Sequence, residues 1–174
     1  NKIKSSGLLD TYRAVKNKLD FPMTMGYSAV GITTKAYEKY NLNKGQRIFT
    51  NSFHQEEALI DFNMCVEIPD DLDSKSATFG ALGGIAMQSI KCIPDGSKDV
   101  VFIGLGLLGQ ITLRILRAKG FNCIVFDLDI MKIELAEKYG AIGVRENLTE
   151  TVLYHTKGNG ADSTIIAAAS QSSN

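Results

Sequence analysis

The clearest pattern of hydrophobic and polar positions covers residues 99–127. Residues 100–103, Val-Val-Phe-Ile, form a short apolar run, which is typical of a strand buried on both faces of a parallel sheet. After a glycine-rich stretch, apolar residues recur with the spacing of one helix face: Leu108, Ile111, Ile115 and Ala118. Gly120 stands where a helix ends, and a second apolar run, residues 123–126, leads to Asp127. The pattern predicts a strand–helix–strand unit.

The glycines of this unit have the spacing G-x-G-x-x-G. Gly104 allows a sharp turn out of the strand, Gly106 lets a pyrophosphate approach backbone N–H groups, and Gly109 lets the helix pack closely against the strand. Asp127 lies 18 positions past Gly109 (127 − 109), near the ~20 expected for the acid that binds the adenosine ribose. The order of these features favours dinucleotide binding over a tight turn that binds nothing. The candidate phosphate-binding residues are Gly104, Leu105, Gly106, Leu107, Leu108 and Gly109.

The same alternation continues after Asp127. Asp129 can cap a helix that ends at Gly140 and has apolar residues at Ile130, Ile133, Ala136 and Tyr139. Residues 141–144 predict a third strand, residues ~147–157 a further helix, and residues 163–168 a fourth strand. Alternating strands and helices with short loops predict a doubly wound parallel sheet.

The first half of the chain has a different pattern. Residues ~5–19 have apolar positions at helical spacing, and residues 72–92 predict two helical segments bent around glycines 80, 83 and 84. Between them lie short β-like pieces separated by turn residues, at residues 27–34, 47–50, 57–60 and 64–68. Short strands without intervening helices predict a small antiparallel or barrel-like domain. We therefore expect one domain over residues 1–92 and a second over residues 93–174.

Composition narrows the class of protein. Hydrophobic content of 44% and charged content of 22% are ordinary for a globular protein, and 19 basic residues balance 19 acidic ones. There is no basic excess for nucleic acid, no apolar run of the ~20 residues that a membrane span needs, and no visible signal peptide. Cys65, Cys92 and Cys123 are far apart, which favours reduced, mostly buried thiols in the cytoplasm. We expect a cytoplasmic protein with a small-molecule substrate and neither nucleic-acid nor membrane partners. A homo-oligomer is left open.

Several motifs ahead of the glycine-rich unit carry a family resemblance: Pro22-x3-Gly26-Tyr27-Ser28-x2-Gly31, Lys44-Gly45-Gln46-Arg47 and Ile68-Pro69-Asp70. Together with that unit, they resemble the medium-chain dehydrogenase/reductase superfamily, in which a GroES-like β-barrel precedes a Rossmann domain. Residues 77–88 and the Gly26 motif are most similar to the bacterial bi-domain oxidoreductases. The resemblance implies an α/β fold, with a partial GroES-like β-barrel domain followed by part of a Rossmann doubly wound parallel sheet.

The ends of the chain suggest a fragment of a longer protein. The sequence begins with Asn1 rather than Met, and it stops shortly after the fourth predicted parallel strand, whereas a full dinucleotide fold usually has six. We expect the fragment alone to lack turnover.

The resemblance has one departure. Zinc alcohol dehydrogenases of the superfamily usually have Gly-His-Glu where this chain has Gly26-Tyr27-Ser28, and that His is a catalytic zinc ligand. Tyr and Ser are poor replacements, and the spacing of a four-cysteine structural zinc lobe is absent. The early cysteine ligand of the family would lie before Asn1. We therefore expect no metal site.

Other candidate site residues each have an ordinary structural alternative. Asp127 either binds the ribose or caps a helix. Lys132 either reaches the ribose or a phosphate, or is simply solvated. Ala169 either lines the cofactor crevice or is a plain strand exit. The hydroxyls of Tyr27 and Ser28 orient a substrate or relay a proton, or Tyr27 is a core residue. His54 is a general acid/base or, the reading that we favour, a surface-loop histidine.

These features predict an NAD(H)-dependent oxidoreductase that transfers a hydride to or from an alcohol or carbonyl, which the resemblance implies is sugar-like. The alternative is a non-catalytic NAD-binding module. Asp127 and Asp129 would repel the 2′-phosphate of NADP, so NAD is expected to bind about a hundredfold or more tightly.

Overall fold

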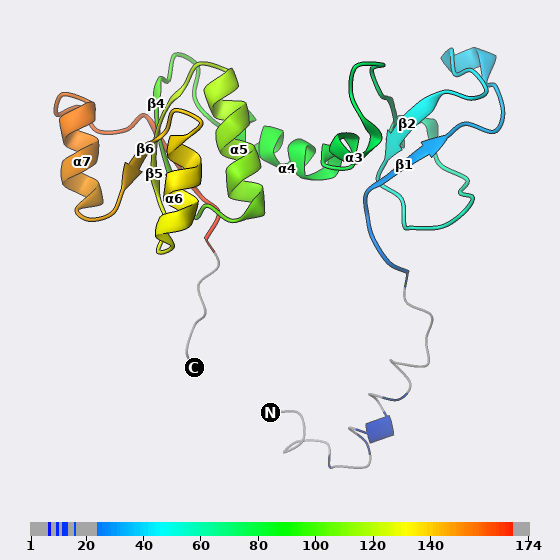
Figure 1. The fold of residues 1–174 in the computed structure, drawn as a ribbon, viewed down its shortest axis with the longest axis horizontal. Helices are drawn as coiled ribbons and strands as arrows, with labels where there is room; N and C mark the ends of the chain where they lie inside the picture. The colour runs from blue at the N-terminus through cyan, green and yellow to red at the C-terminus, as the bar shows by residue number, and fades with distance from the viewer. Residues whose placement is uncertain (1–6, 8–9, 11, 14–15, 17–23, 169–174) are drawn as a thin grey trace. The chain divides into compact units, whose positions relative to one another are not determined.

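The computed structural model describes residues 24–168, together with Gly7, Asp10, Tyr12, Arg13 and Lys16 ahead of them. The helix expected over residues 5–19 therefore lies largely outside the described residues. The chain forms two compact units, Asn1–Thr78 and Phe79–Asn174 (Figure 1). These units divide the chain earlier than residue 92, because the helix that ends at Lys91 packs its Ile90 into the core of the second unit.

The first unit contains a three-stranded antiparallel sheet in the order β1-β2-β3. Its strands are β1 (Ala29–Ile32), β2 (Arg47–Thr50) and β3 (Cys65–Glu67). Two 3₁₀ turns, η1 (Glu38–Tyr40) and η2 (Phe62–Met64), and the short helix α3 (Ser74–Ala77) complete it. The strand expected at residues 57–60 is wrong: these residues form irregular chain, and Leu59 is fully exposed with no strand to pair with in the described sheet.

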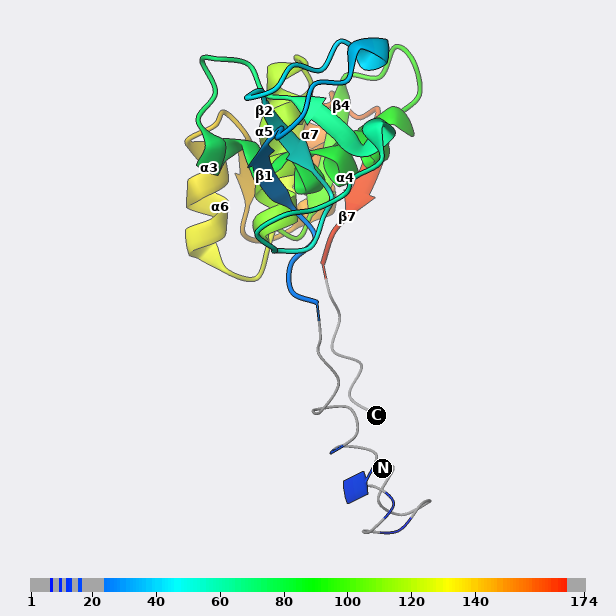
Figure 2. The ribbon, with the colours of Figure 1, turned by 90° about the vertical axis from the view of Figure 1, so that its right-hand side faces the viewer.

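The second unit begins with α4 (Gly80–Lys91) and then alternates strands and helices. In order these are β4 (Asp99–Ile103), α5 (Leu107–Ala118), β5 (Asn122–Phe126), α6 (Ile130–Glu137), β6 (Ile142–Val144), α7 (Leu148–His155) and β7 (Ser163–Ile166). The four strands form a parallel sheet in the order β6-β5-β4-β7 (Figure 1 and Figure 2). The chain thus adds strands on one side of β4 and then returns to the other side, which confirms the predicted doubly wound topology.

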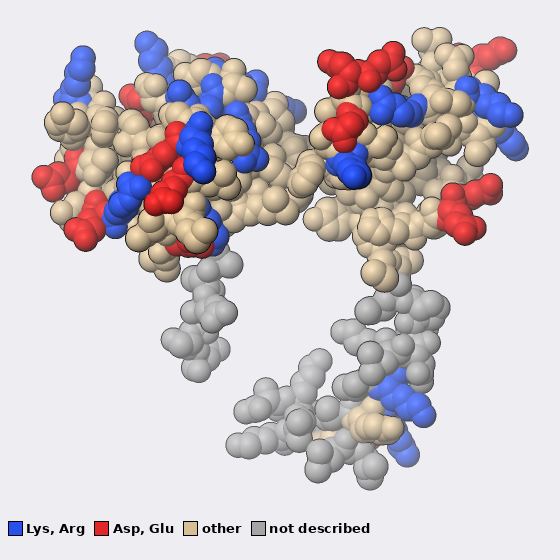
Figure 3. Space-filling view, viewed as in Figure 1, with Lys and Arg blue, Asp and Glu red and all other residues tan. Residues whose placement is uncertain are grey.

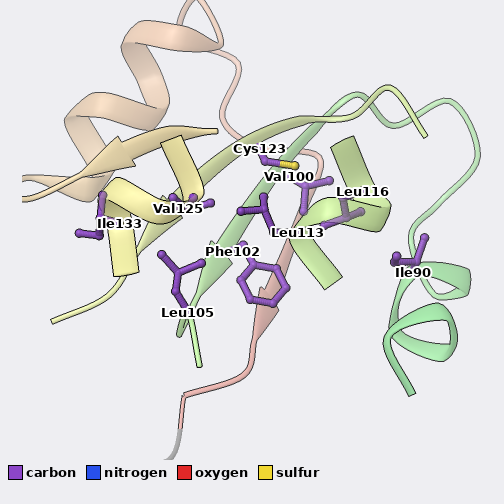
Figure 4. Packing of buried hydrophobic residues seen from close by; sticks show 10 residues of the cluster. Ile90, Val100, Phe102, Leu105, Leu113, Leu116, Cys123, Val125 and Ile133 are labelled. Carbon is purple, nitrogen blue, oxygen red and sulfur yellow. The ribbon is translucent and has the colours of Figure 1, made fainter. Parts of the chain in front are cut away.

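The core lies on both faces of this sheet. On one face Val100, Phe102 and Val125 pack with residues of α4, α5 and α6, including the fully buried Leu113 and Leu116 (Figure 4). On the other face Val101, Ile124 and Val144 pack with partly buried residues of α7. Burial on both faces explains why the strands have continuous apolar runs rather than an alternating pattern.

Two details of the predicted helices are wrong. The buried face of α5 is formed by Gly109, Leu113 and Leu116, whereas Leu108, Ile111 and Ile115 are half-buried and Ala118 is exposed. The face is shifted because Gly109 is the residue that approaches the end of β4. The helical segment 72–92 breaks between α3 and α4, at Thr78 and Phe79, and glycines 83 and 84 lie inside α4.

The expectation of mostly buried thiols is also wrong. Cys123 is buried, Cys65 is half-buried and Cys92 is exposed, because Cys92 follows the last turn of α4 rather than lying on a strand. All three are free thiols. In the part of the chain that the structure describes, no helix is both long and apolar enough to cross a bilayer.

Candidate cofactor site

Two glycines of the turn after β4 are required by the geometry. Gly104 has φ +95°, in the left-handed region, and its N–H donates to the Phe126 carbonyl at 2.9 Å. A Cβ at Gly104 would lie 2.5 Å from the backbone nitrogen of Ala168, which follows β7. A Cβ at Gly109 would overlap the Gly104 carbonyl oxygen. The turn is therefore closed from one side by the exit of β7 and from the other by α5.

Gly106 and the start of α5 face open space instead. A Cβ on Gly106 would have no heavy atom within 4 Å among its described surroundings. Gly106 precedes α5 at its N-terminus, and Gln110 N–H donates to the Gly106 carbonyl at 2.8 Å. Within residues 24–168, the N–H groups of Leu107, Leu108 and Gly109 have no hydrogen-bond acceptor. Unpaired donors at the positive end of a helix suit an anion such as a pyrophosphate.

Asp127 directly follows β5, at the same edge of the sheet as this turn. Its side chain is only 13% exposed, and its Oδ2 accepts the Leu105 N–H at 2.6 Å while its Oδ1 accepts the Asp129 N–H at 2.9 Å. Burial raises the pKa of Asp127, but these two backbone donors, the backbone N–H of Leu128 and the charge of Lys132 outweigh burial and hold the pKa below its ordinary value. Asp127 is therefore ionised at neutral pH.

Lys132 lies on the first turn of α6, beside two acids. Its Nζ is 3.8 Å from Asp127 Oδ1 and 3.5 Å from Asp129 Oδ2. Asp129 also caps α6, as predicted, since its Oδ1 accepts the Met131 N–H at 3.0 Å. The three residues form a cluster with two negative charges and one positive charge at the expected ribose end.

Sequence reasoning missed Gln110. This residue is buried on α5, and its Nε2 donates to the Lys132 carbonyl at 3.0 Å, so it fixes the first turn of α6 against α5. The sequence signal for this role is a polar residue on the buried side of an otherwise apolar helix. Which side of α5 is buried follows from the structure.

At the exit of β7, Ala167 N–H donates to the Ile103 carbonyl at 2.8 Å, and Ala168 lies beside Gly104. Ala169, the residue predicted to line the crevice, lies outside the described residues. The described neighbours nevertheless bring this segment to the glycine-rich turn, at the point where the strand order reverses. Ligands of open α/β sheets bind at such points.

The candidate catalytic residues lie in the first unit. Gly26 has φ +78°, and the imidazole of His54 lies so close that a Cβ on Gly26 would overlap it. The backbone N–H of His54 donates to the Met25 carbonyl at 2.7 Å. His54 is exposed, as a surface-loop histidine would be. The Ser28 hydroxyl donates to the Thr78 carbonyl, and Tyr27 is 61% exposed. The structure therefore brings His54 next to the segment with Tyr27 and Ser28, and Tyr27 is not a core residue.

The donor set at Gly26-Tyr27-Ser28 does not fit a catalytic zinc ion. Neutral Tyr and Ser hydroxyls are not the thiolate, imidazole or carboxylate ligands that zinc takes, and the Ser28 hydroxyl is already bonded to a carbonyl. Among the described residues, no three His, Cys, Asp or Glu side chains come together as a metal site. The absence of zinc from the whole protein stays a prediction.

Charged side chains of both signs lie on the face of the second unit that Figure 3 shows. Figure 3 shows acidic and basic side chains intermixed on the visible face of this unit, without an extended area of one sign. One such pair joins Arg145 to Glu137 through two 3.0 Å hydrogen bonds, which lower the pKa of Glu137.

Comparison with known proteins identifies the fold. No protein-family model matches the chain. Among solved structures, 2R,3R-butanediol dehydrogenase from Bacillus subtilis matches 83% of this chain and 51% of its own, with a TM-score of 0.69 and 18% identity. The Escherichia coli quinone oxidoreductase solved with NADPH matches 86% and 51%, with a TM-score of 0.61 and 21% identity. The alcohol dehydrogenase RspB of E. coli, solved with NADH, matches 94% and 59%, with a TM-score of 0.68 and 16% identity.

The chain thus spans about half the length of these solved structures. The likeness to these dehydrogenase and oxidoreductase structures extends over more than four-fifths of this chain and concerns the fold. The predicted fold class is therefore confirmed: part of a GroES-like domain followed by part of a Rossmann sheet.

Proposed function

We propose that this chain is the cofactor-binding part of a medium-chain oxidoreductase that uses a nicotinamide dinucleotide. The observation that carries the proposal is the pairing of unpaired N–H donors at the start of α5 with an ionised Asp127 at the end of the neighbouring strand. Leu107 and Leu108 would hold the pyrophosphate and Asp127 the adenosine ribose. When bound, the nicotinamide supplies the hydride chemistry, and the role of these residues is to bind and orient it.

We propose NAD rather than NADP as the cofactor. A 2′-phosphate at the ribose would meet the charges of Asp127 and Asp129, of which Lys132 offsets only one. Like-charge contacts of this kind cost several kcal/mol, so a preference for NAD of about a hundredfold is expected.

Titration of the full chain with NADH and NADPH, followed by nicotinamide fluorescence, tests this choice. Wild type should bind NADH about a hundredfold more tightly, and Asp127→Ser should weaken NADH binding and narrow the gap. Equal affinities in wild type would mean that Asp127 does not face the ribose. No binding of either cofactor would overturn the proposed function.

The substrate of the whole protein is proposed to be a small alcohol or carbonyl compound. The alternative function is a non-catalytic module, which has no substrate. The similarity to a butanediol dehydrogenase supports a polyol-like substrate. Tyr27, Ser28 and His54 are proposed to orient it or relay a proton, without catalytic zinc.

Incubating the whole protein with NAD and a panel of alcohols and sugars separates the enzyme from the module. Growth of NADH absorbance with any substrate supports the enzyme, whereas cofactor binding without turnover supports the module. Elemental analysis of the same sample should find no stoichiometric zinc. One tightly held zinc ion per chain would overturn the zinc-free proposal. The cytoplasmic location stays a prediction.

A further inference from the structure

The carboxylate of Asp127 already has partners within the chain. One oxygen accepts the Leu105 N–H at 2.6 Å and the other accepts the Asp129 N–H at 2.9 Å. Leu105 is the residue between the first two glycines of the turn, and its own side chain is 1% exposed. The acid at the expected ribose end is therefore bonded directly to the turn expected to hold the pyrophosphate.

Other contacts hold the atoms around the Leu105 N–H, since Gly104 N–H donates to the Phe126 carbonyl and the Leu105 side chain is buried. The Leu105 N–H itself depends on Asp127. Gly104 and Gly106 flank Leu105 and have no side chains, and glycine is the residue with the greatest conformational freedom. Without Asp127, the Leu105 N–H would lose its acceptor, since the described chain offers no other hydrogen bond to this group. A backbone donor in a part-buried position that loses its partner favours rearrangement of the turn.

We propose that Asp127 is a positioning residue for the phosphate-binding turn as well as a ribose-binding residue, so that one carboxylate couples recognition of the adenosine ribose to recognition of the neighbouring pyrophosphate. The proposal rests on the proposed function, because it concerns the same site. It adds that the shape of residues 104–109 depends on a side chain that comes from the next strand.

The carboxylate has the capacity for both roles. An ionised carboxylate has about four lone-pair sites. The Leu105 N–H takes one site on Oδ2, and the Asp129 N–H takes one on Oδ1. The Lys132 ammonium, at 3.8 Å, is an ion-pair partner beyond hydrogen-bond distance. The backbone N–H of Leu128 also interacts with the carboxylate, so about one site remains, which is enough for one hydroxyl of a ribose.

The sign of one mutational effect distinguishes positioning from simple electrostatics. Removing an acid next to an anion site normally strengthens anion binding, because repulsion is removed. If Asp127 holds the turn, its removal must instead weaken binding of a phosphate ligand that has no ribose. Asp129→Asn is the matched control: it also removes one negative charge beside Lys132, keeps the cap of α6, and leaves the Asp129 backbone N–H in place.

The experiment titrates the full chain with inorganic pyrophosphate. Binding is followed by the NMR signals of the backbone amides. Asp127→Ala should weaken pyrophosphate binding by about tenfold, the effect of losing one hydrogen bond to a charged group. Asp129→Asn should bind pyrophosphate as tightly as wild type or more tightly. Asp127→Asn, whose side-chain oxygen can still accept the Leu105 N–H, should restore most of the lost affinity.

Amide hydrogen exchange tests the same coupling without any ligand. The Leu105 amide should be protected in wild type and exchange at least about tenfold faster in Asp127→Ala, while the amides of β4 and β5 keep their protection and show that the sheet is folded. If the alanine variant does not fold, Asp127→Ser replaces it, since the short Ser side chain does not reach Leu105.

Pyrophosphate binding in Asp127→Ala that equals or exceeds wild type would overturn the proposal, as would unchanged exchange at Leu105. A wild-type chain that binds neither NADH nor pyrophosphate would overturn the proposed function and, with it, the recognition role of Asp127. The exchange of Leu105 in the variants would then still decide whether Asp127 holds the turn.

Discussion

The two units of the chain bury their apolar residues to very different extents. In the second unit, strands β4 and β5 and helix α5 contain residues with no exposed surface, such as Phe102 and Leu113. In the described part of the first unit, only Ile68 and Ala77 are buried hydrophobic residues, and β1 and β3 expose Ile32 and Val66. The second unit therefore has a packed core, whereas the described strands of the first unit are mostly half-buried or exposed.

The difference follows from connectivity. A strand–helix–strand unit brings its own helix back onto its own sheet, so residues 99–127 already contain both sides of a core. A three-stranded antiparallel sheet has no such helix, and each of its faces needs a covering element from elsewhere. We infer that most of the free energy of folding of this chain resides in the second unit, and four experiments address that inference.

The largest expected effect comes from removing a buried side chain from the core of the second unit. Phe102→Ala should lower the free energy of unfolding by about 3–5 kcal/mol, because it removes a fully buried ring and leaves a cavity. Val66→Ala, on the exposed side of β3, should change it by less than about 1 kcal/mol. Urea denaturation followed by circular dichroism measures both. Similar losses for the two variants would contradict the comparison.

Thiol labelling sharpens the comparison within one molecule. Burial raises the pKa of Cys123 to about 11, whereas Cys65 is only half-buried in β3. In a Cys92→Ser background, a disulfide reagent should label Cys65 about a hundredfold faster than Cys123, because Cys123 reacts only when the second unit opens. Mass spectrometry of the labelled peptides gives the two rates. Equal rates would show that the two units open together.

Two helix glycines test how tightly the turn is packed. Gly109→Ala should destabilise the chain by about 1–3 kcal/mol, because the new methyl group would overlap the Gly104 carbonyl. Gly84→Ala is the control: it lies inside α4 with no atom within 4 Å of its Cβ position, and it should stabilise the helix by up to about 1 kcal/mol. The denaturation midpoints of the two variants, compared with that of wild type, measure both effects. A neutral Gly109→Ala would mean that α5 does not pack against the turn as described.

The smallest expected effect is the pH dependence from Asp162. Its carboxylate accepts the N–H groups of Asp99 and Lys98, which hold its pKa below the ordinary value. Stability from this group is therefore present above the unfolded pKa of about 3.9 and is lost as pH falls through the lower folded pKa. Asp162→Asn should flatten the acid limb of the stability curve below about pH 4. Asp73→Asn, which affects only a local cap in the first unit, should leave the unfolding of the second unit unchanged.

The sequence predicted the strand–helix–strand unit and the position of Asp127 directly after its second strand, because the signals for both are local. Apolar runs, glycine spacing and the acid after β5 all lie within residues 99–127. The doubly wound parallel sheet was also predicted, from the alternation of strands and helices with short connections. The order of its four strands comes from the structure. The cofactor bound at these residues stays a prediction until it is titrated.

The errors concern features that depend on contacts distant in sequence. The apolar pattern of α5 allowed two overlapping faces, and only the approach of Gly109 to the Gly104 carbonyl selects one. Residues 57–60 look like a strand by composition, but the described sheet has no place for them. The hydrogen bond between the Leu105 N–H and Asp127 was not predicted either, because no spacing rule indicates which oxygen a backbone N–H group binds.

The position of β7 beside β4 determines when the site can form during synthesis. β5 follows β4 after a single helix, whereas β7 arrives only after α6, β6 and α7. One edge of β4 therefore stays open while most of the second unit leaves the ribosome, and closing that long loop is the slowest pairing of the sheet. Because Ala168 closes the turn at Gly104, a nascent chain gains this closed turn only when β7 docks beside β4.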